Sequence, residues 1–335
     1  MSISRQVFCL KTLILLSFFY QQIGRFIGSI LLPIGSLFAM ISSLVMTAFK
    51  KIVVIGAGTM CSGIAAHLAN SERNVVLLDL KSKTKDAPNE ISERALDIIK
   101  KSDPPLLVEK SRLKYIQPGN LTDDFDEIKD ADWIIEAVVE RIDIKHSLYA
   151  KIDKVRSDAS IVSSNTSTIP LSVLTSEMSD SMKSDFCITH FFNPVRFMRL
   201  LEIVETPDVN AKKMSLLRDF CKNELGKGIV NCNDTPGFIG NRIGVYAMQV
   251  AMYEALDRGL PVEIADALFG RPLGIPKTGV FGLYDLIGID LMKDVLASFK
   301  KELQPEDPFM EVVKPHPIVE DLLDKGYTGN TGPGG

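Results

Sequence analysis

A glycine-rich stretch early in the chain carries the residue types that bind nucleotide phosphates. Gly56 and Gly58 follow a short apolar run, and Cys61 stands where the G-x-G-x-x-G pattern has its third glycine. The first glycine permits a tight turn and the second lets the backbone approach a pyrophosphate, whose charge the first amides of the next helix attract. We therefore predict that Gly56, Gly58, Thr59 and Met60 bind a dinucleotide.

The departure at Cys61 concerns packing more than phosphate binding. The third glycine normally lets the helix lie close to the strand, so a cysteine there predicts a buried thiol and a small outward shift of the helix. Asp79, at the end of the next apolar run, is placed to accept hydrogen bonds from the adenosine ribose. Its charge would repel a 2′-phosphate, which favours NAD over NADP, although a solvated carboxylate at a strand end remains an alternative.

Four further polar patches lie far apart in the sequence, each near the end of an expected strand. They are "EAVVERIDIK" (136–145), "SSNTSTIP" (163–170), "THFFNPVRFMRLLEIV" (189–204) and "DTPGFIGNRI" (234–243). Ligands of open α/β sheets bind at the carboxyl ends of the strands, so we expect the patches to converge on one site.

His190 is the candidate general base in this site. Hydride transfer to NAD needs a group that takes the hydroxyl proton, and an imidazole has a suitable pKa. Glu202 lies twelve residues further on, a spacing that suits two adjacent strands, and a carboxylate behind an imidazole orients it. Ser167 and Asn241 are candidate donors to the substrate oxygen, and helix or turn capping is the alternative role for both.

The composition narrows the class of protein. The 335 residues are 46% hydrophobic and 24% charged, with a formal net charge of −4, which fits a globular chain of two domains. The acidic balance argues against a nucleic-acid partner. Five cysteines without C-x-x-C or Cys/His ligand spacing predict a reduced protein with no metal site, and we expect it in the cytoplasm.

The pattern of elements predicts an α/β protein. Short apolar runs alternate with helical segments up to about residue 235, which predicts a Rossmann-type doubly wound sheet, and only helical patterns follow. One of these is an expected helix over 283–303. We therefore assign residues 50–235 to an NAD-binding domain and 236–335 to an all-helical C-terminal domain.

Residues 1–49 form an apolar leader. Residues 26–49 carry no charge and are long enough to span a bilayer. Three interpretations are open: a membrane anchor through residues 26–49, a cleaved targeting segment, or a mis-assigned start. We favour the third, because a start at Met46 would precede the first strand by a few residues, and a membrane partner is expected only if the leader is genuine.

Taken together, these patches give the chain a family resemblance. From about Lys51 onward it resembles the L-3-hydroxyacyl-CoA dehydrogenases of fatty-acid β-oxidation, in the motifs "SNTS", "HFFNP" and "DTPGFIGNR". The resemblance implies reversible oxidation of a 3-hydroxyacyl-CoA with NAD. It implies His190 as general base, Glu202 as its partner and substrate-oxygen contacts from Ser167 and Asn241. The NAD contacts that it implies are Asp79, Glu140, Lys145 and Asn165.

The resemblance also bears on assembly and leaves alternatives. Family members are usually dimers through the helical domain, and the arginines in "NPVRFMRLLE" are more similar to bacterial multidomain β-oxidation proteins. We expect a homodimer or part of such a protein, and the ending "GNTGPGG" leaves open a truncated helical domain. A dehydrogenase of a free hydroxy acid, like the gulonate dehydrogenase and lambda-crystallin branch, and a non-catalytic NAD-binding relative are the alternatives.

Overall fold

The described chain begins at a buried aromatic residue. The structure, a computed structural model, describes residues 49–335 except residues 276, 315, 331 and 335, so the expected leader lies outside the described residues apart from Phe49. The Phe49 ring packs against Trp133 and Phe220, with centroid distances of 6.1 and 4.7 Å. Within the described residues, none of the helices has the length and apolar character needed to cross a bilayer.

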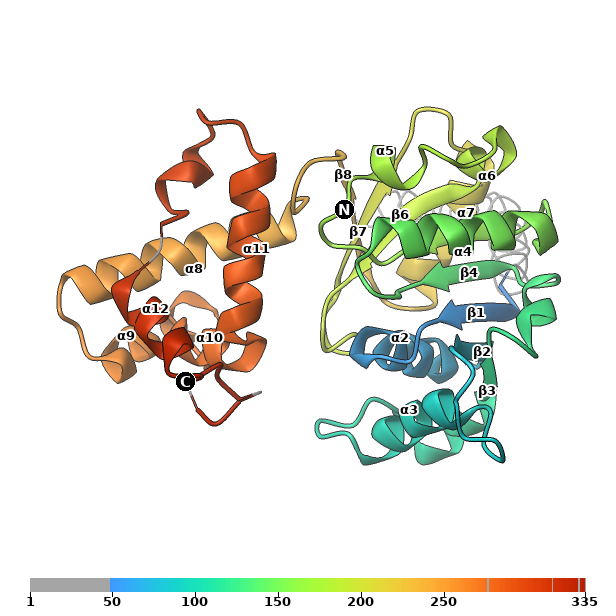
Figure 1. Ribbon diagram of the computed structural model, residues 1–335, viewed down its shortest axis with the longest axis horizontal. Coiled ribbons are helices and arrows are strands. Elements are labelled where there is room, and N and C mark those ends of the chain that lie inside the picture. The colour runs from blue at the N-terminus through green and yellow to red at the C-terminus, as the bar shows by residue number, and fades with distance from the viewer. Residues whose placement is uncertain (1–48, 276, 315, 331, 335) are drawn as a thin grey trace, which may run out of the picture.

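One eight-stranded sheet forms the centre of the first domain (Figure 1). Its order is β3-β2-β1-β4-β5-β6-β7-β8, and the six strands from β3 to β6 in that order are parallel. The strands are β1 (Lys51–Ile55), β2 (Asn74–Asp79), β3 (Ile116–Asn120), β4 (Trp133–Glu136), β5 (Ile161–Ser164), β6 (Phe186–Phe191), β7 (Leu200–Glu205) and β8 (Gly228–Cys232). This order and the crossover helices confirm the expected Rossmann-type doubly wound sheet.

Helices cover both faces of the sheet, which is why most positions of the central strands are apolar and buried. In β1, Ile52 and Val54 pack toward α2 (Thr59–Asn70), α3 (Glu90–Lys101) and α7 (Ala211–Asn223). Val53 and Ile55 pack on the opposite face, toward α4 (Ile142–Val155), α5 (Leu171–Leu174) and α6 (Asp180–Ser184). The 3₁₀ helices η1 (Lys110–Tyr115) and η2 (Phe125–Ile128) lie in the connections on either side of β3.

The strand β7 reverses direction after the parallel part of the sheet. It pairs antiparallel with β6, and His190 stands directly opposite Glu202 in their register. Directly paired residues of antiparallel strands place their side chains on the same face, so the register alone brings these two side chains together.

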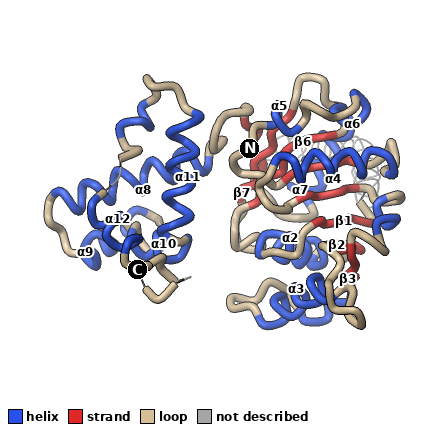
Figure 2. The backbone as a smooth tube through the Cα atoms, viewed as in Figure 1, coloured by secondary structure: helices blue, strands red, loops and turns tan. Residues whose placement is uncertain are grey.

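The second domain is helical and lies beside the sheet domain, joined to it by the chain that leaves β8 (Figures 1 and 2). It contains α8 (Gly240–Asp257), α9 (Val262–Leu268), η3 (Arg271–Leu273), α10 (Phe281–Ile287), α11 (Ile289–Glu302), η4 (Pro308–Glu311) and α12 (Pro317–Asp324). A separate apolar core of residues such as Met252, Tyr284, Met292 and Phe299 holds these helices together.

Some details differ from the expectation. The single helix expected over 283–303 is wrong, because Gly288 adopts φ 106° and separates α10 from α11. This backbone conformation is one that glycine readily adopts. The strands β3 and β8 and the helix α7 were not expected from the sequence. Pro118 and Gly119 interrupt the strand pattern in β3, and a polar Asn231 interrupts it in β8.

Candidate active site

The centre of the site is a buried pair formed by His190 and Glu202. His190 Nδ1 lies 2.7 Å from Glu202 Oε2. Glu202 has no exposed surface, and 5% of His190 is exposed. Because Nδ1 faces the carboxylate, the other ring nitrogen, Nε2, is the one available to a ligand in the adjoining cleft.

The second carboxylate oxygen of Glu202 is held by the start of α8. Oε1 accepts hydrogen bonds from the backbone amides of Ile239 at 2.9 Å and Gly240 at 2.6 Å. The thiol of Cys232 lies 3.6 Å from the same oxygen. Burial alone would raise the pKa of Glu202, but the hydrogen bonds from His190 and from these amides outweigh it and lower the pKa. Glu202 is therefore held as an anion.

Two phenylalanines fix the plane of the imidazole. The ring centroids of Phe192 and Phe238 lie 4.4 and 5.5 Å from that of His190, and both rings are inclined to it. Phe238 adopts φ 49°, which is uncommon for a residue with a side chain. Burial of its ring stabilises this backbone conformation. The imidazole is thus fixed on two sides by aromatic rings and from behind by a carboxylate.

His190 lines a cleft of about 390 Å³ between the two domains. Residues of all four polar patches line this cleft, so the expectation that the patches converge on one site is confirmed. The sheet domain contributes Met60, Glu140, Lys145, Asn165, Ser167 and His190, and the helical domain contributes Asn241 and an apolar wall. That wall consists of Val245, Ile287, Leu291, Met292 and Val295.

Lys145 is a fully buried cation in the wall of the cleft. Its Nζ lies 2.6 Å from Glu136 Oε1 and 3.0 Å from Glu140 Oε2. Glu136 is also buried and accepts hydrogen bonds from Tyr149 and from Ser164. The carboxylate of Glu136 therefore fixes Lys145 against the cleft. Sequence reasoning gave Glu136 no role; a carboxylate at the end of an apolar strand was the available signal.

Glu140 organises the loop that follows β5. Its Oε1 accepts hydrogen bonds from the hydroxyl of Thr166 and, at 3.2 Å, from the amide of Ser167. Burial alone would raise the pKa of Glu140, but the charge of Lys145 and these hydrogen bonds lower it. The ionised carboxylate thus positions Ser167 at the cleft.

Asn165 connects the loop to β6. Its side-chain Oδ1 accepts a hydrogen bond from the backbone amide of Phe191 at 2.9 Å, and its backbone amide donates to the carbonyl of Glu136 at 2.7 Å. With Oδ1 engaged by the backbone, the NH₂ group of Asn165 is the part left to serve as a donor in the cleft.

The glycine-rich loop has the shape that a phosphate site requires. Gly56 adopts φ 114°, and a Cβ on Gly58 would meet no atom within 4 Å. Gly58 is the N-cap residue of α2, and no side chain caps the helix there. Thr59 and Met60 form its first turn, so their amides face the open side of the loop.

Cys61 fills the space beside Gly56. A Cβ on Gly56 would lie 2.6 Å from Cys61 Sγ and 2.8 Å from the carbonyl oxygen of Ala137. Only 1% of Cys61 is exposed, and burial raises the pKa of its thiol to about 12. The expected burial of the thiol is confirmed, and Cys61 is unreactive packing rather than a nucleophile.

Asp79 ends β2 next to this loop. Its Oδ2 accepts a hydrogen bond from the amide of Ala57 at 2.6 Å, and Oδ1 accepts one from Leu80 at 2.6 Å. The carboxylate therefore ties the end of β2 to the turn between Gly56 and Gly58. An uncapped helix start, an open glycine and an adjacent carboxylate together fit the phosphates and the ribose of a dinucleotide.

Two family models match the chain. Residues 51–235 match "3-hydroxyacyl-CoA dehydrogenase, NAD binding domain", and residues 237–335 match "3-hydroxyacyl-CoA dehydrogenase, C-terminal domain". The two matches together span almost the whole described chain.

Individual proteins agree with these matches. A protein of Rickettsia felis, named as a fatty acid oxidation complex trifunctional enzyme, is 42% identical over 85% of this chain and 40% of its own length. The mitochondrial hydroxyacyl-coenzyme A dehydrogenase of Rattus norvegicus is 32% identical over 85% of this chain and 90% of its own length. The crystal structure of (S)-3-hydroxybutyryl-CoA dehydrogenase from Ralstonia eutropha superimposes with a TM-score of 0.65 and 28% identity, covering 84% of this chain and 96% of that one.

The chain is short beside some of these proteins. It covers 40%, 40% and 37% of the length of three curated relatives, the Rickettsia felis protein among them.

Proposed function

The chain belongs to the 3-hydroxyacyl-CoA dehydrogenase family, and we propose that it catalyses the reversible oxidation of an L-3-hydroxyacyl-CoA to the 3-ketoacyl-CoA with NAD. The observation that carries this proposal is the pair formed by His190 and Glu202 at the wall of the cleft between the domains.

His190 acts as the general base in the proposed reaction. Its Nε2 accepts the proton of the substrate hydroxyl, while Glu202 fixes Nδ1 and stabilises the imidazolium that forms. When bound, NAD would supply the acceptor for the hydride that leaves the carbon carrying this hydroxyl. In the reverse direction the same imidazolium returns the proton to the ketone oxygen.

Ser167 and Asn241 hold the reacting oxygen. Both side chains line the cleft that His190 lines, one from each domain. As the hydroxyl becomes a carbonyl, a neutral donor stays matched to the oxygen in both states, and in the reverse direction it stabilises the developing alkoxide.

The proposed cofactor contacts follow from the sheet edge. The loop of Gly56 and Gly58, with the amides of Thr59 and Met60, binds the pyrophosphate, and Asp79 binds the adenosine ribose. Glu140, Lys145 and Asn165 bind the nicotinamide half, because they line the same cleft as His190.

The apolar wall of the helical domain favours an acyl substrate over a free hydroxy acid. Its five side chains are aliphatic or, in Met292, a thioether, and they offer a polyhydroxylated acid no hydrogen bonds. An acyl chain would bury apolar surface against this wall.

We propose that the acyl-CoA is an intermediate of fatty-acid oxidation and that the chain works as a homodimer or within a larger multidomain protein. The name of the Rickettsia felis relative supports this context.

The proposal is tested by following NADH absorbance with acetoacetyl-CoA as the oxidised substrate. We expect NADH oxidation that depends on the thioester and that acetoacetate cannot support. Equal rates with free acetoacetate would instead favour a dehydrogenase of a free hydroxy acid, and NADH binding without oxidation would favour a non-catalytic relative.

A further inference from the structure

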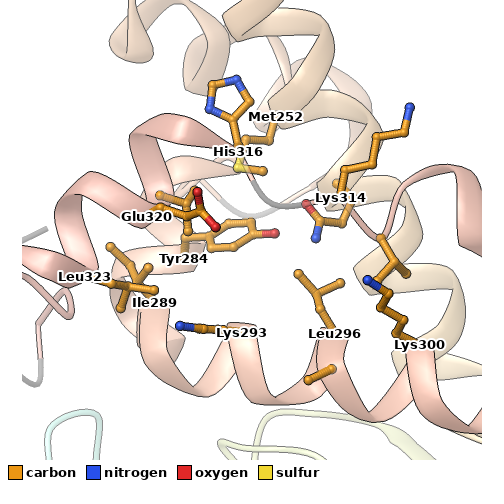
Figure 3. A pocket seen from close by; sticks show the side chains of 14 residues that line it. Met252, Tyr284, Ile289, Lys293, Leu296, Lys300, Lys314, His316, Glu320 and Leu323 are labelled. Carbon is orange, nitrogen blue, oxygen red and sulfur yellow. The ribbon is translucent and has the colours of Figure 1, made fainter.

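A second cavity lies inside the helical domain, apart from the cleft that His190 lines. Its volume is about 250 Å³, and residues of α8, α10, α11 and α12 line most of it. Figure 3 shows the ring of Tyr284 extending across this cavity, with Lys293 and Leu296 from α11 at another side. Much of the lining is apolar, including Met252, Ile289, Leu296, Val319 and Leu323.

Two buried polar side chains in this lining have no partner among the described residues. Gln249 has no exposed surface, and neither its Oε1 nor its Nε2 makes a hydrogen bond. The hydroxyl of Tyr284, a residue that is 5% exposed, is also unpaired. Buried polar groups are nearly always hydrogen-bonded, so an unpaired amide and an unpaired phenol in one cavity call for a polar partner there.

The rim of the cavity is positively charged. Lys293, Lys300 and Lys314 line it and are exposed, and none forms an ion pair with another described residue. Glu320 is the one carboxylate among the described lining residues. Lys293 and Lys300 are seven residues apart on α11, so they lie on the same face of the helix. An excess of unpaired cations favours an anionic ligand.

We propose that this cavity binds a medium-chain aliphatic carboxylate. Its carboxylate accepts hydrogen bonds from Gln249 Nε2 and the Tyr284 hydroxyl and lies in the field of the lysines. Burial raises the pKa of Tyr284, so its hydroxyl stays protonated and can donate. The aliphatic chain packs against the apolar lining.

The volume of the cavity limits how much of an aliphatic chain it can enclose. A volume of about 250 Å³ corresponds to roughly eight groups of the size of a water molecule or a methylene, at ~30 Å³ each. This is room for a carboxylate with about six to eight carbons. An inorganic anion would leave the apolar lining unfilled, and a hydrocarbon would leave Gln249 and Tyr284 unpaired.

The helix α11 separates this cavity from the cleft between the domains. Met292 and Val295 line the cleft, whereas the neighbouring Lys293 and Leu296 line the cavity. Substitutions at Gln249, Leu296 or Lys300 therefore change the cavity without replacing a residue of the cleft.

Isothermal titration calorimetry of the full chain with sodium octanoate tests the proposal. We expect saturable binding of one octanoate per chain, and weaker binding of butanoate. Gln249→Leu should weaken octanoate binding by about tenfold or more, since it removes a hydrogen bond to a charged group. Lys300→Ala should also weaken it, and the matched control Lys301→Ala, exposed on the same helix but outside the lining, should leave it unchanged.

Two further arms separate the cavity from the cleft. Leu296→Trp should fill the cavity and abolish octanoate binding, with thermal unfolding as the check on folding. Saturating acetoacetyl-CoA and NADH should leave octanoate binding in place. Absence of saturable binding, binding that persists in Leu296→Trp, butanoate binding as tight as octanoate binding, or displacement by acetoacetyl-CoA would each overturn the proposal. Failure of the dehydrogenase assay would not, because the titration does not depend on turnover.

Discussion

At the scale of single residues, Glu202 determines which nitrogen of His190 faces the cleft. One of its oxygens faces His190 Nδ1, and the other accepts the amides of Ile239 and Gly240. Since those amides can only donate, the oxygen that faces them must be an acceptor. Because Glu202 is held as an anion, its Oε2 accepts a hydrogen bond from Nδ1–H of His190, and Nε2 of the neutral ring is left as the acceptor in the cleft.

Glu202→Gln is expected to reverse this arrangement. The amides of Ile239 and Gly240 would hold the glutamine oxygen and turn its NH₂ toward His190, so Nδ1 would become the acceptor and Nε2 would carry the proton. We expect turnover to fall by about 10²- to 10⁴-fold, as for a triad imidazole in the wrong tautomer. Steady-state kinetics with acetoacetyl-CoA measures this; a loss below tenfold would contradict the role of the carboxylate.

The lowered pKa of Glu202 also predicts how stability depends on pH. A carboxylate whose pKa is lower in the folded protein stabilises it fully above the ordinary glutamate value of about 4.3. That contribution is lost as the pH falls through the lower, folded-state pKa. The free energy of unfolding of the wild type should therefore drop more steeply below about pH 4.3 than that of Glu202→Gln. Urea unfolding of both proteins from pH 7 to pH 3 tests this, and parallel curves would refute it.

At the scale of elements, the start of α8 connects the helical domain to the pair formed by His190 and Glu202. Its first residue, Gly240, approaches β7 and Phe192 so closely that a Cβ would lie 2.7 Å from Phe192 Cζ and 3.2 Å from Leu200 Cδ2. The same close approach lets the Gly240 amide reach Glu202. Gly240 does not have a positive φ, so a side chain there would be disfavoured by its contact with Phe192 and not by the backbone conformation.

Gly240→Ala is therefore expected to impair catalysis. The new methyl group would displace Phe192, which packs on His190, and would move the amide away from Glu202. A misplacement of this size lowers kcat/KM by about 10²-fold. The matched control is Gly244→Ala in the same helix, where a Cβ meets nothing within 4 Å; it should keep full activity and gain about 0.5–1 kcal/mol of stability. Equal activity of the two variants would contradict the account.

In helix α2, Cys61→Gly is expected to change stability and not catalysis. The thiol fills space between β1 and the carbonyl of Ala137, and glycine is a poor helix former. The free energy of unfolding should fall by about 1–3 kcal/mol, with little change in NAD affinity. Urea unfolding and a fluorescence titration with NADH measure the two effects. A large loss of NADH affinity with stability unchanged would show that the thiol is not simply packing.

At the scale of the whole molecule, the cleft exists only because two domains meet. The sheet domain presents His190, Lys145 and Ser167, and the helical domain presents Asn241 and the apolar wall. In the proposed reaction the hydride leaves the carbon and the proton leaves the oxygen of one hydroxyl group, so both domains have to face the same substrate atoms.

The sequence allowed much of this to be predicted, for physical reasons. The alternation of short apolar runs with helical segments and the glycine-rich turn are local patterns, and they predict the Rossmann domain correctly. The pairing of His190 with Glu202 was predictable because two strands joined by a short turn usually lie side by side. The roles of the site residues remain predictions.

Other features depend on contacts that no local pattern carries. Gly288 fits a helical pattern until its φ of 106° is known. In the sequence Glu136 looks like an ordinary strand residue, and only the structure shows its buried ion pair with Lys145 of the following helix. The two amides that hold Glu202 come from 37 and 38 residues further along the chain. Each of these is a tertiary contact, which a single sequence does not specify.

Replacing the proton acceptor tests the proposed dehydrogenase chemistry most directly. His190→Gln keeps a polar side chain of similar size but removes the group that takes the substrate proton. In an NADH absorbance assay with acetoacetyl-CoA, we expect the variant to lose about 10³-fold or more in turnover. NADH affinity, measured by fluorescence, should stay as in the wild type. Turnover that matches the wild type would contradict the assignment of His190 as the general base, and with it the proposed dehydrogenase chemistry.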